Sequence, residues 1–165
     1  MRRLMEDVER IELSNGMEVV VQRTQTSTIA AELEVNAGAL YEEKGEEGLA
    51  HFLEHVIVRS AREYNPAELH AEQIKLGEFN ANTNFHKVAL TGDMTEEDLE
   101  RFLSISSAMA FSPDFNPEVI EEERKRILRE MADVFSNPSH LDAIRFRERE
   151  NAWEKSSINQ NCFGL

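Results

Sequence analysis

The sequence predicts an α+β fold, in which a mixed or antiparallel sheet is covered by helices. Segments with strand character gather at the start of the chain, at residues 8–13, 17–24 and 28–38. Helical patterns dominate from residue 48 onward, and one further strand pattern returns between them at 78–92. Early strands followed by late helices favour this class over a regularly alternating α/β fold.

The first two strands are predicted to form a β-hairpin around Asn15 and Gly16. This dipeptide suits the positive backbone angles of a tight turn, and the second strand is rich in β-branched residues. The third strand, at 28–38, alternates small or apolar residues with polar ones. We expect the hairpin and the third strand to share one sheet.

Two helices and one strand are predicted in the middle of the chain. The first helix covers residues 48–60. Asn65 supplies an N-cap and Pro66 a first-turn proline for the second helix, which ends at Gly77. The alternating pattern that follows predicts one continuous strand.

Three helices are predicted after this strand. Thr95 and Asp98 form a capping box for a helix that runs to residue 111, and Pro117 opens a long acidic helix that runs to about residue 134. A last helix is expected at 141–153. Residues 155–165 have no regular pattern and are expected to form a loose tail.

The composition indicates one soluble domain, residues 1–165. With 32 acidic and 18 basic residues, the net charge is −14, which repels a nucleic acid or an anionic membrane over most of the surface. No apolar run approaches the ~20 residues of a membrane span or forms a signal peptide, so we expect a cytoplasmic protein. Cys162 is the single cysteine, so the chain has no internal disulfide and no cysteine-based zinc site.

Two histidines and a glutamate share one face of the first predicted helix. The apolar side chains of this helix fall on one side of a helical wheel, and His51, Glu54 and His55 fall on the other. Histidines at positions i and i+4 are able to chelate one metal ion. The alternative is a surface helix with two solvated histidines, and the motif by itself leaves this open.

A third metal ligand is expected from the long acidic helix. Glu130 is three residues from Ile127 and four from Val134, so we expect it beside the buried edge of this helix, where a carboxylate needs a cation or a metal. Glu123 lies two turns earlier on nearly the same face. It is placed to orient a ligand or a water, or else it is a plain surface glutamate.

These motifs resemble the pitrilysin/insulinase family of zinc peptidases, which includes the mitochondrial processing peptidases. The resemblance is carried by GALYEEKGEEGLAHFLEHVIV, which contains the inverted zincin signature His-x-x-Glu-His, and by FNANT and EEERKRILREM in the same order. It implies that zinc is bound by His51, His55 and Glu130. It further implies that Glu54 is the catalytic base and that Glu123 is an auxiliary catalytic glutamate.

The same resemblance implies a substrate-binding strand. The family's Asn-Ala-x-Thr segment corresponds to Asn80, Ala81, Asn82 and Thr83, which would hold the backbone of an extended peptide at a sheet edge. From the residues alone this segment is only the polar start of a strand. His86, where the family often has an acidic residue, departs from the pattern, and we interpret it as a surface histidine, like His70 and His140.

The resemblance further implies a second, similar half that closes over the substrate, and we expect residues 1–165 to contain only the first half. The leading hypothesis is a zinc endopeptidase domain that hydrolyses peptide bonds in extended polypeptides. The alternative is a zinc-binding and peptide-binding subunit that is active only with a partner chain. A third possibility is an acidic interaction domain without metal. We expect the missing half to be supplied by a homodimer or by a related half-length partner.

Overall fold

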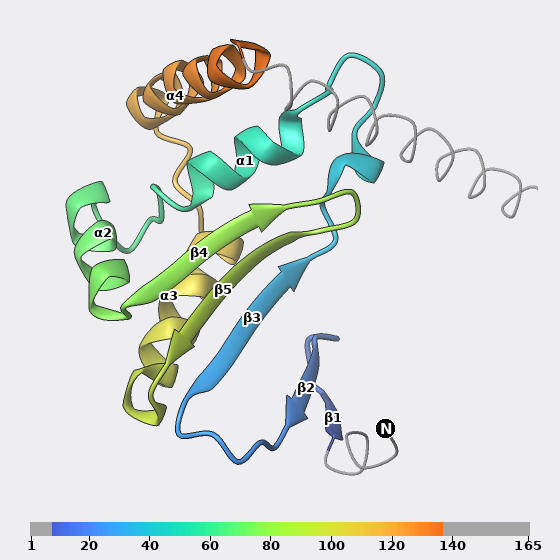
Figure 1. Cartoon of the computed structure of the whole chain (residues 1–165), viewed down its shortest axis with the longest axis vertical. Helices are drawn as coiled ribbons and strands as arrows, with labels where there is room; N and C mark the ends of the chain where they lie inside the picture. The colour runs from blue at the N-terminus through green and yellow to red at the C-terminus, as the bar shows by residue number, and fades with distance from the viewer. Residues whose placement is uncertain (1–7, 137–165) are drawn as a thin grey trace, which may run out of the picture.

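The computed structural model describes residues 8–136, and it confirms the α+β class (Figure 1). The strands are β1 Val8–Glu12, β2 Glu18–Gln22, β3 Ile29–Val35, β4 Glu78–Thr83 and β5 Val88–Met94. The α-helices are α1 Leu49–Ile57, α2 Pro66–Lys75, α3 Leu99–Phe111 and α4 Pro117–Ser136. Two short 3-10 helices, η2 Ala39–Tyr41 and η3 Glu96–Asp98, complete the described elements. The predicted helix at 141–153 and the tail at 155–165 lie outside the described residues.

The main sheet has three antiparallel strands in the order β3-β5-β4. β3 and β5 are far apart in sequence, since Ile29 pairs with Met94, whereas β4 and β5 are neighbours in the chain. β4 pairs only with β5 within the described part of the chain, so its other edge is free there. No helix among residues 8–136 is both long and apolar enough to span a membrane.

The predicted β-hairpin forms, but the prediction that it shares a sheet with the third strand is wrong. Among residues 8–136, β1 and β2 pair only with each other, and Figure 1 shows them beside β3 as a separate ribbon. The turn at Gly16, which has a φ of 84°, fixes only the pairing inside the hairpin. The hairpin exposes large apolar side chains, namely those of Val8, Ile11, Leu13, Val20 and Val21.

The segment at 78–92 is two strands, not the single strand that its alternation predicted. Asn84 breaks it, because its side-chain oxygen accepts hydrogen bonds from the backbone N–H groups of His86 and Lys87, at 2.8 and 2.9 Å. This side chain builds a tight turn between β4 and β5. The Lys87 ammonium then reaches back to Glu34 and Glu32 on β3, and these contacts raise the pKa of Lys87 above its usual value.

The helix ends follow the predicted signals in part. Asn65 caps α2, accepting hydrogen bonds from the N–H groups of Ala67 and Glu68, as expected for a capping box. The predicted box at Thr95 does not form. Its hydroxyl is 3.4 Å from a carboxylate oxygen of Asp98 instead of a backbone N–H, and the chain enters α3 through the 3-10 turn η3.

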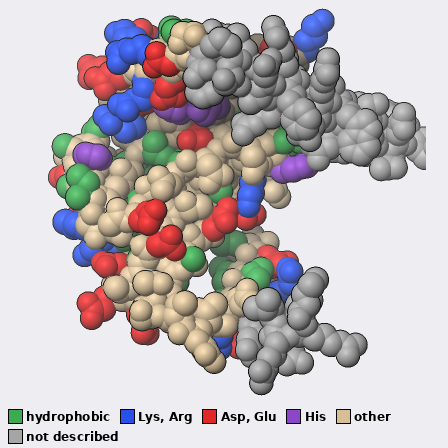
Figure 2. All heavy atoms as spheres, in the orientation of Figure 1, with side chains coloured by type: hydrophobic (Ala, Val, Ile, Leu, Met, Phe, Trp, Pro, Cys, Tyr) green, Lys and Arg blue, Asp and Glu red, His purple; other side chains and the backbone are tan. Residues whose placement is uncertain are grey.

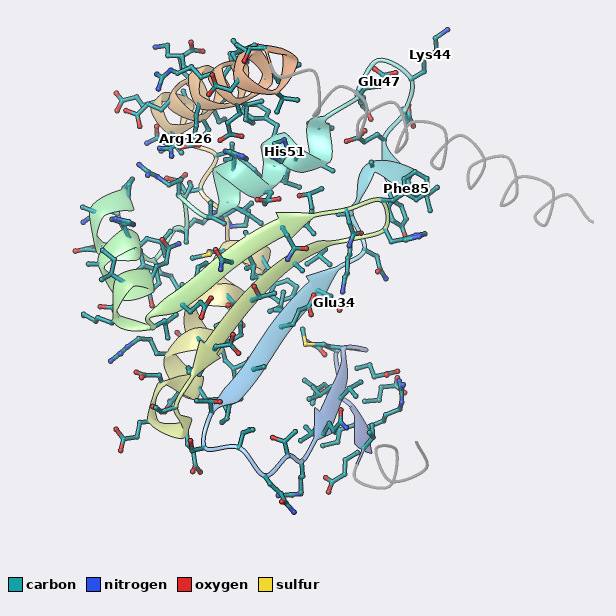
Figure 3. The ribbon with its side chains drawn as sticks, viewed as in Figure 1. Glu34, Lys44, Glu47, His51, Phe85 and Arg126 are labelled. Atoms are coloured by element: carbon teal, nitrogen blue, oxygen red, sulfur yellow. The ribbon has the colours of Figure 1, made fainter. Side chains whose placement is uncertain are left out.

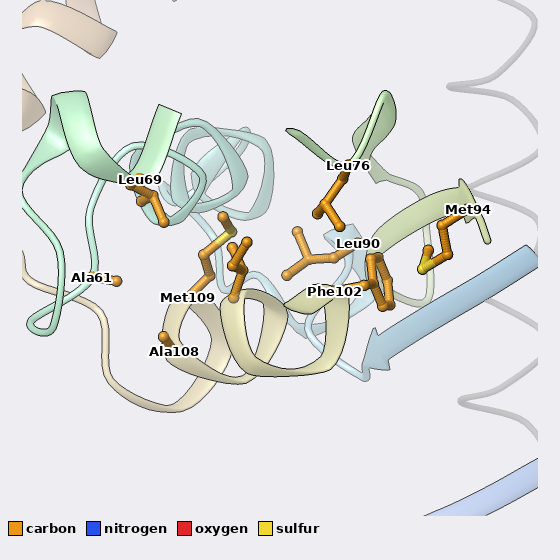
Figure 4. Close-up of a cluster of buried hydrophobic side chains, with 9 residues drawn as sticks. Ala61, Leu69, Leu76, Leu90, Met94, Phe102, Ala108 and Met109 are labelled. Atoms are coloured by element: carbon orange, nitrogen blue, oxygen red, sulfur yellow. The ribbon is translucent and has the colours of Figure 1, made fainter. Parts of the chain in front are cut away.

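The core lies between the sheet and helices α2 and α3 (Figure 4). Phe102 of α3 is fully buried, and its ring packs against Phe79 of β4 at 6.1 Å between centroids. Gly92 of β5 lies beneath this ring, where an added Cβ would come within 2.9 Å of Phe102. This packing holds β4 and β5 firmly, while α1 lies between β4 and α4.

Candidate active site

The candidate site is built on α1, which is anchored at its start by a distant carboxylate. Glu42 accepts hydrogen bonds from the N–H groups of Gly48 and Ala50, at 3.2 and 2.9 Å, and so satisfies donors that a helix start leaves unpaired. Val56 and Ile57 are buried beneath the helix. This anchoring fixes which face of α1 turns toward α4 and β4.

The two histidines of α1 meet at their Nε2 atoms, which are 3.2 Å apart. Their rings are perpendicular, with centroids 4.7 Å apart. Glu130 reaches the same point from α4, with one carboxylate oxygen 3.5 Å from Nε2 of His55. One ligand atom from each of His51, His55 and Glu130 lies within 4.8 Å of the others, so the structure brings the predicted metal ligands together.

This donor set fits a zinc ion. Zinc–nitrogen bonds are about 2.0–2.1 Å long, and a tetrahedral angle between two of them separates the nitrogens by about 3.3 Å. The Nε2 atoms already lie at nearly that separation. Two neutral imidazoles and one carboxylate are a usual zinc ligand set that leaves a fourth position free.

Glu123 lies directly behind His55. Its carboxylate is 2% exposed, and Oε2 is 3.2 Å from Nδ1 of His55. When Nδ1–H donates to this carboxylate, Nε2 is left as the lone-pair nitrogen that faces the other ligands. The interpretation of Glu123 as a plain surface glutamate is therefore wrong.

Glu130 is more exposed than predicted. Its side chain is 47% exposed, not pressed against the buried edge of the helix. The reason is that α4 is covered mainly by α1: burial is deep at Val119 and Glu123 but declines along the helix, and Leu128 and Met131 are exposed. Glu130 thus lines an open groove.

Glu54 points toward the end of β4, where the Thr83 hydroxyl donates a hydrogen bond to its carboxylate. Along β4, Ala81 and Thr83 are half-buried on the helix side, whereas Asn80 and Asn82 are exposed. Asn80 and Ala81 line a groove of about 260 Å³ together with Glu54, His55 and Glu130. The structure thus brings four predicted residues of β4 to the free edge beside the helix, although Asn82 and Thr83 do not line the groove.

Two arginines that the sequence motifs did not indicate, Arg59 and Arg126, also line this groove. Nε of Arg126 is 3.1 Å from Oε2 of Glu123, and Nε of Arg59 is 3.8 Å from its Oε1. The spacing of Glu123 and Arg126 at i and i+3 was a usable signal, but nothing local connects Arg59 to α4. Figure 3 shows Arg126 at the side of α4 that faces α1.

The remaining histidines agree with their interpretation as surface residues. His70 and His86 are exposed, and both lie outside the ligand cluster. His140 lies outside the described residues. Figure 2 shows basic and acidic side chains side by side over α4, close to a histidine.

The chain matches known proteases in sequence and in fold. Residues 18–160 match the family model described as Insulinase (Peptidase family M16). An uncharacterized zinc protease of Rickettsia bellii is 29% identical over 136 residues, which are 81% of this chain and 33% of that protein. Subunit beta of the mitochondrial-processing peptidase of Rattus norvegicus is 31% identical over 126 residues, which are 76% of this chain and 26% of that subunit.

Solved structures show the same fold. A protease from Helicobacter pylori superposes with a TM-score of 0.70 at 25% identity, over 75% of this chain and 30% of that one. The first half of the periplasmic protease PqqL from Escherichia coli gives a TM-score of 0.73 at 20% identity, over 82% of this chain and 31% of that one. The chain spans about a third or less of the length of the relatives it matches. From the extent of the family match, we conclude that the chain belongs to the insulinase family, peptidase family M16.

Proposed function

We propose that this chain is a zinc-dependent endopeptidase domain that hydrolyses peptide bonds in extended polypeptides. The observation that carries the proposal is the meeting of the two Nε2 atoms, 3.2 Å apart, beside Glu130. A buried carboxylate behind His55 supports it, since an imidazole held in this way is typical of metal centres. His51, His55 and Glu130 would hold the zinc. When bound, zinc would supply a Lewis acid that polarises the scissile carbonyl and acidifies a water.

Glu54 is the proposed general base. It accepts a proton from the attacking water and delivers it to the leaving amine, so no covalent intermediate forms. The Thr83 hydroxyl fixes the position of this carboxylate by donating to it. Glu123 acts through His55, because it keeps Nδ1 protonated and Nε2 directed at the metal.

The free edge of β4 is the proposed binding site for the substrate backbone. An extended peptide that adds to a sheet edge gains main-chain hydrogen bonds whatever its sequence. Asn80, Ala81, Asn82 and Thr83 belong to this edge strand, and the groove beside it leads to Glu54. Peptides and poorly folded segments are therefore the expected substrate class.

The second candidate function is a zinc- and peptide-binding subunit that turns over only with a partner chain. The observation that favours it is the half-exposed side chain of Glu130, which leaves the groove open on that side. A closed site excludes bulk water from the reaction, and an open groove does not. The partner would be a second copy or a related half-length chain. A cytoplasmic location remains our expectation.

The test compares the parent chain with Glu54→Gln. The proposed function predicts one zinc per chain in both proteins, and a loss of peptide cleavage by at least about a hundredfold in the variant. Glu122→Gln, an exposed glutamate of α4, is the matched control and should cleave like the parent. Stoichiometric zinc without cleavage would favour the partner-dependent subunit. An absence of bound zinc in the parent would contradict both candidates and favour the acidic interaction domain.

A further inference from the structure

Arg59 and Arg126 bring two positive charges to one end of the groove. Arg59 follows α1 and Arg126 belongs to α4, and both line the groove with Glu123. Within residues 8–136, Glu123 is the sole carboxylate within 4 Å of either guanidinium. In a chain with a net charge of −14, two arginines that share one carboxylate stand out.

The two guanidiniums retain unused hydrogen-bond donors. The atom of each that lies closest to Glu123 is Nε, and for Arg59 this atom is buried without a hydrogen-bond acceptor among the described residues. Arg59 is 34% exposed and Arg126 is 53% exposed, so solvent reaches both. A guanidinium carries five N–H donors arranged for bidentate recognition of a carboxylate.

The charge balance of the groove also favours an incoming anion. Glu54, Glu123 and Glu130 contribute three negative charges there, and the two arginines contribute two positive charges. A bound zinc dication, which rests on the proposed function, would leave the groove with one positive charge in excess. At physiological salt the Debye length is about 8 Å, so this local charge outweighs the acidic surface beyond the groove.

The spacing of Arg59 from Glu54 indicates how far the arginines would lie from the reacting bond of a peptide on β4. Arg59 follows Glu54 by five residues; α1 ends at Ile57, so the helical rise of 1.5 Å per residue accounts for about 4.5 Å of their separation and the turn after α1 adds to it. A bound strand advances about 3.3 Å per residue. Asn80 and Ala81 line the same groove as the two arginines, so a peptide that pairs with this edge of β4 shares the groove with the guanidiniums.

We propose that Arg59 and Arg126 select a peptide carboxylate about two residues from the scissile bond. This carboxylate is the side chain of Asp or Glu, or the C-terminus of a short peptide. The inference deepens the proposed function by naming its substrate class, and it assigns the two arginines to specificity instead of the chemical step.

The test uses quenched fluorescent peptides that carry either Glu or Gln at one of the three positions on each side of the cleaved bond. We expect about a tenfold higher kcat/KM for Glu at a single position about two residues away, the scale of a charge-assisted hydrogen bond. A C-terminal acid and amide pair separates the terminal carboxylate from the side chain. Arg126→Gln should reduce the preference to less than about threefold.

Arg124→Gln is the matched control. Arg124 lies two residues earlier on α4, pairs with Glu121 and does not line the groove, so its loss should leave the preference unchanged. Equal rates for every Glu and Gln pair would overturn the proposal, as would a preference that persists in both Arg126→Gln and Arg59→Gln.

Binding to the Glu54→Gln variant, followed by fluorescence anisotropy, separates this inference from the proposed function. If the parent chain, with Glu54 intact, cleaves no peptide, but binding to Glu54→Gln shows a Glu preference that disappears when Arg126→Gln is added, the hydrolysis is refuted and the inference is supported. Cleavage with no Glu preference in rate or binding would refute the inference alone.

Discussion

Replacing Glu123 with Gln tests whether the buried carboxylate tunes the candidate metal centre. Glutamine has nearly the same shape, and its oxygen still accepts a hydrogen bond from Nδ1 of His55. The substitution therefore removes the negative charge but leaves the contact at 3.2 Å possible. Because Glu123 is 2% exposed, water does not replace the lost charge.

The expected result is a loss of zinc affinity of about 10- to 100-fold, the usual cost of mutating a partner of a metal-bound histidine, because the neutral amide no longer raises the basicity of His55. This corresponds to about 1.4–2.7 kcal/mol. Competition with a chromophoric chelator measures the affinity, and the far-UV circular dichroism spectrum checks that the variant is folded. Glu121→Gln, an exposed position on the same helix, is the control. Unchanged zinc affinity in a folded Glu123→Gln chain would refute the role that we assign to this carboxylate.

Three other perturbations test separate parts of the structure. Thr83→Val should lower kcat by about tenfold with little change in KM, because the Thr83 hydroxyl positions Glu54. Thr83→Ser keeps a hydroxyl and should have a kcat close to that of the parent, and equal kcat values in the Val and Ser variants would contradict this role. Gly38→Ala should lower the thermal midpoint of unfolding by several degrees, since the added Cβ would come within 2.4 Å of the Asn84 carbonyl oxygen. An unchanged melting curve would mean that the backbone around residue 38 relaxes without cost. Light scattering at micromolar concentration should show a dimer or a larger assembly, and a strictly monomeric chain that cleaves peptides efficiently would show that no second half is needed.

The sequence predicted features that depend on neighbouring residues. The Asn15-Gly16 turn, the Asn65 cap and the histidine pair on one turn of α1 are local patterns, and the structure contains each of them. The prediction failed where a single side chain or a distant partner decides the outcome. Asn84 ends β4 within an alternating run, and alternation alone does not reveal such a turn.

Two contacts made by residues outside the helices of the site were also not predictable from the sequence. Glu42 anchors the start of α1 from outside the helix, and Arg59 joins Glu123 across 64 residues of sequence. Neither contact has a periodicity or a motif of its own. Glu130 was predicted correctly to lie beside the histidines. Its exposure was not predicted, because it depends on how much of α4 is covered by other elements, and the sequence of α4 does not reveal this.

The pairing of β3 with β5 has a kinetic consequence for the metal centre. Joining Ile29 to Met94 closes a long loop that contains α1, and closing such a loop costs more chain entropy than forming the adjacent β4-β5 hairpin. We therefore expect the hairpin to form early and the β3 pairing later. The third metal ligand, Glu130, belongs to α4, so the three ligands come together only once α4 has docked on α1. Zinc would thus slow unfolding more than it accelerates folding, because its complete binding site exists only near the native state.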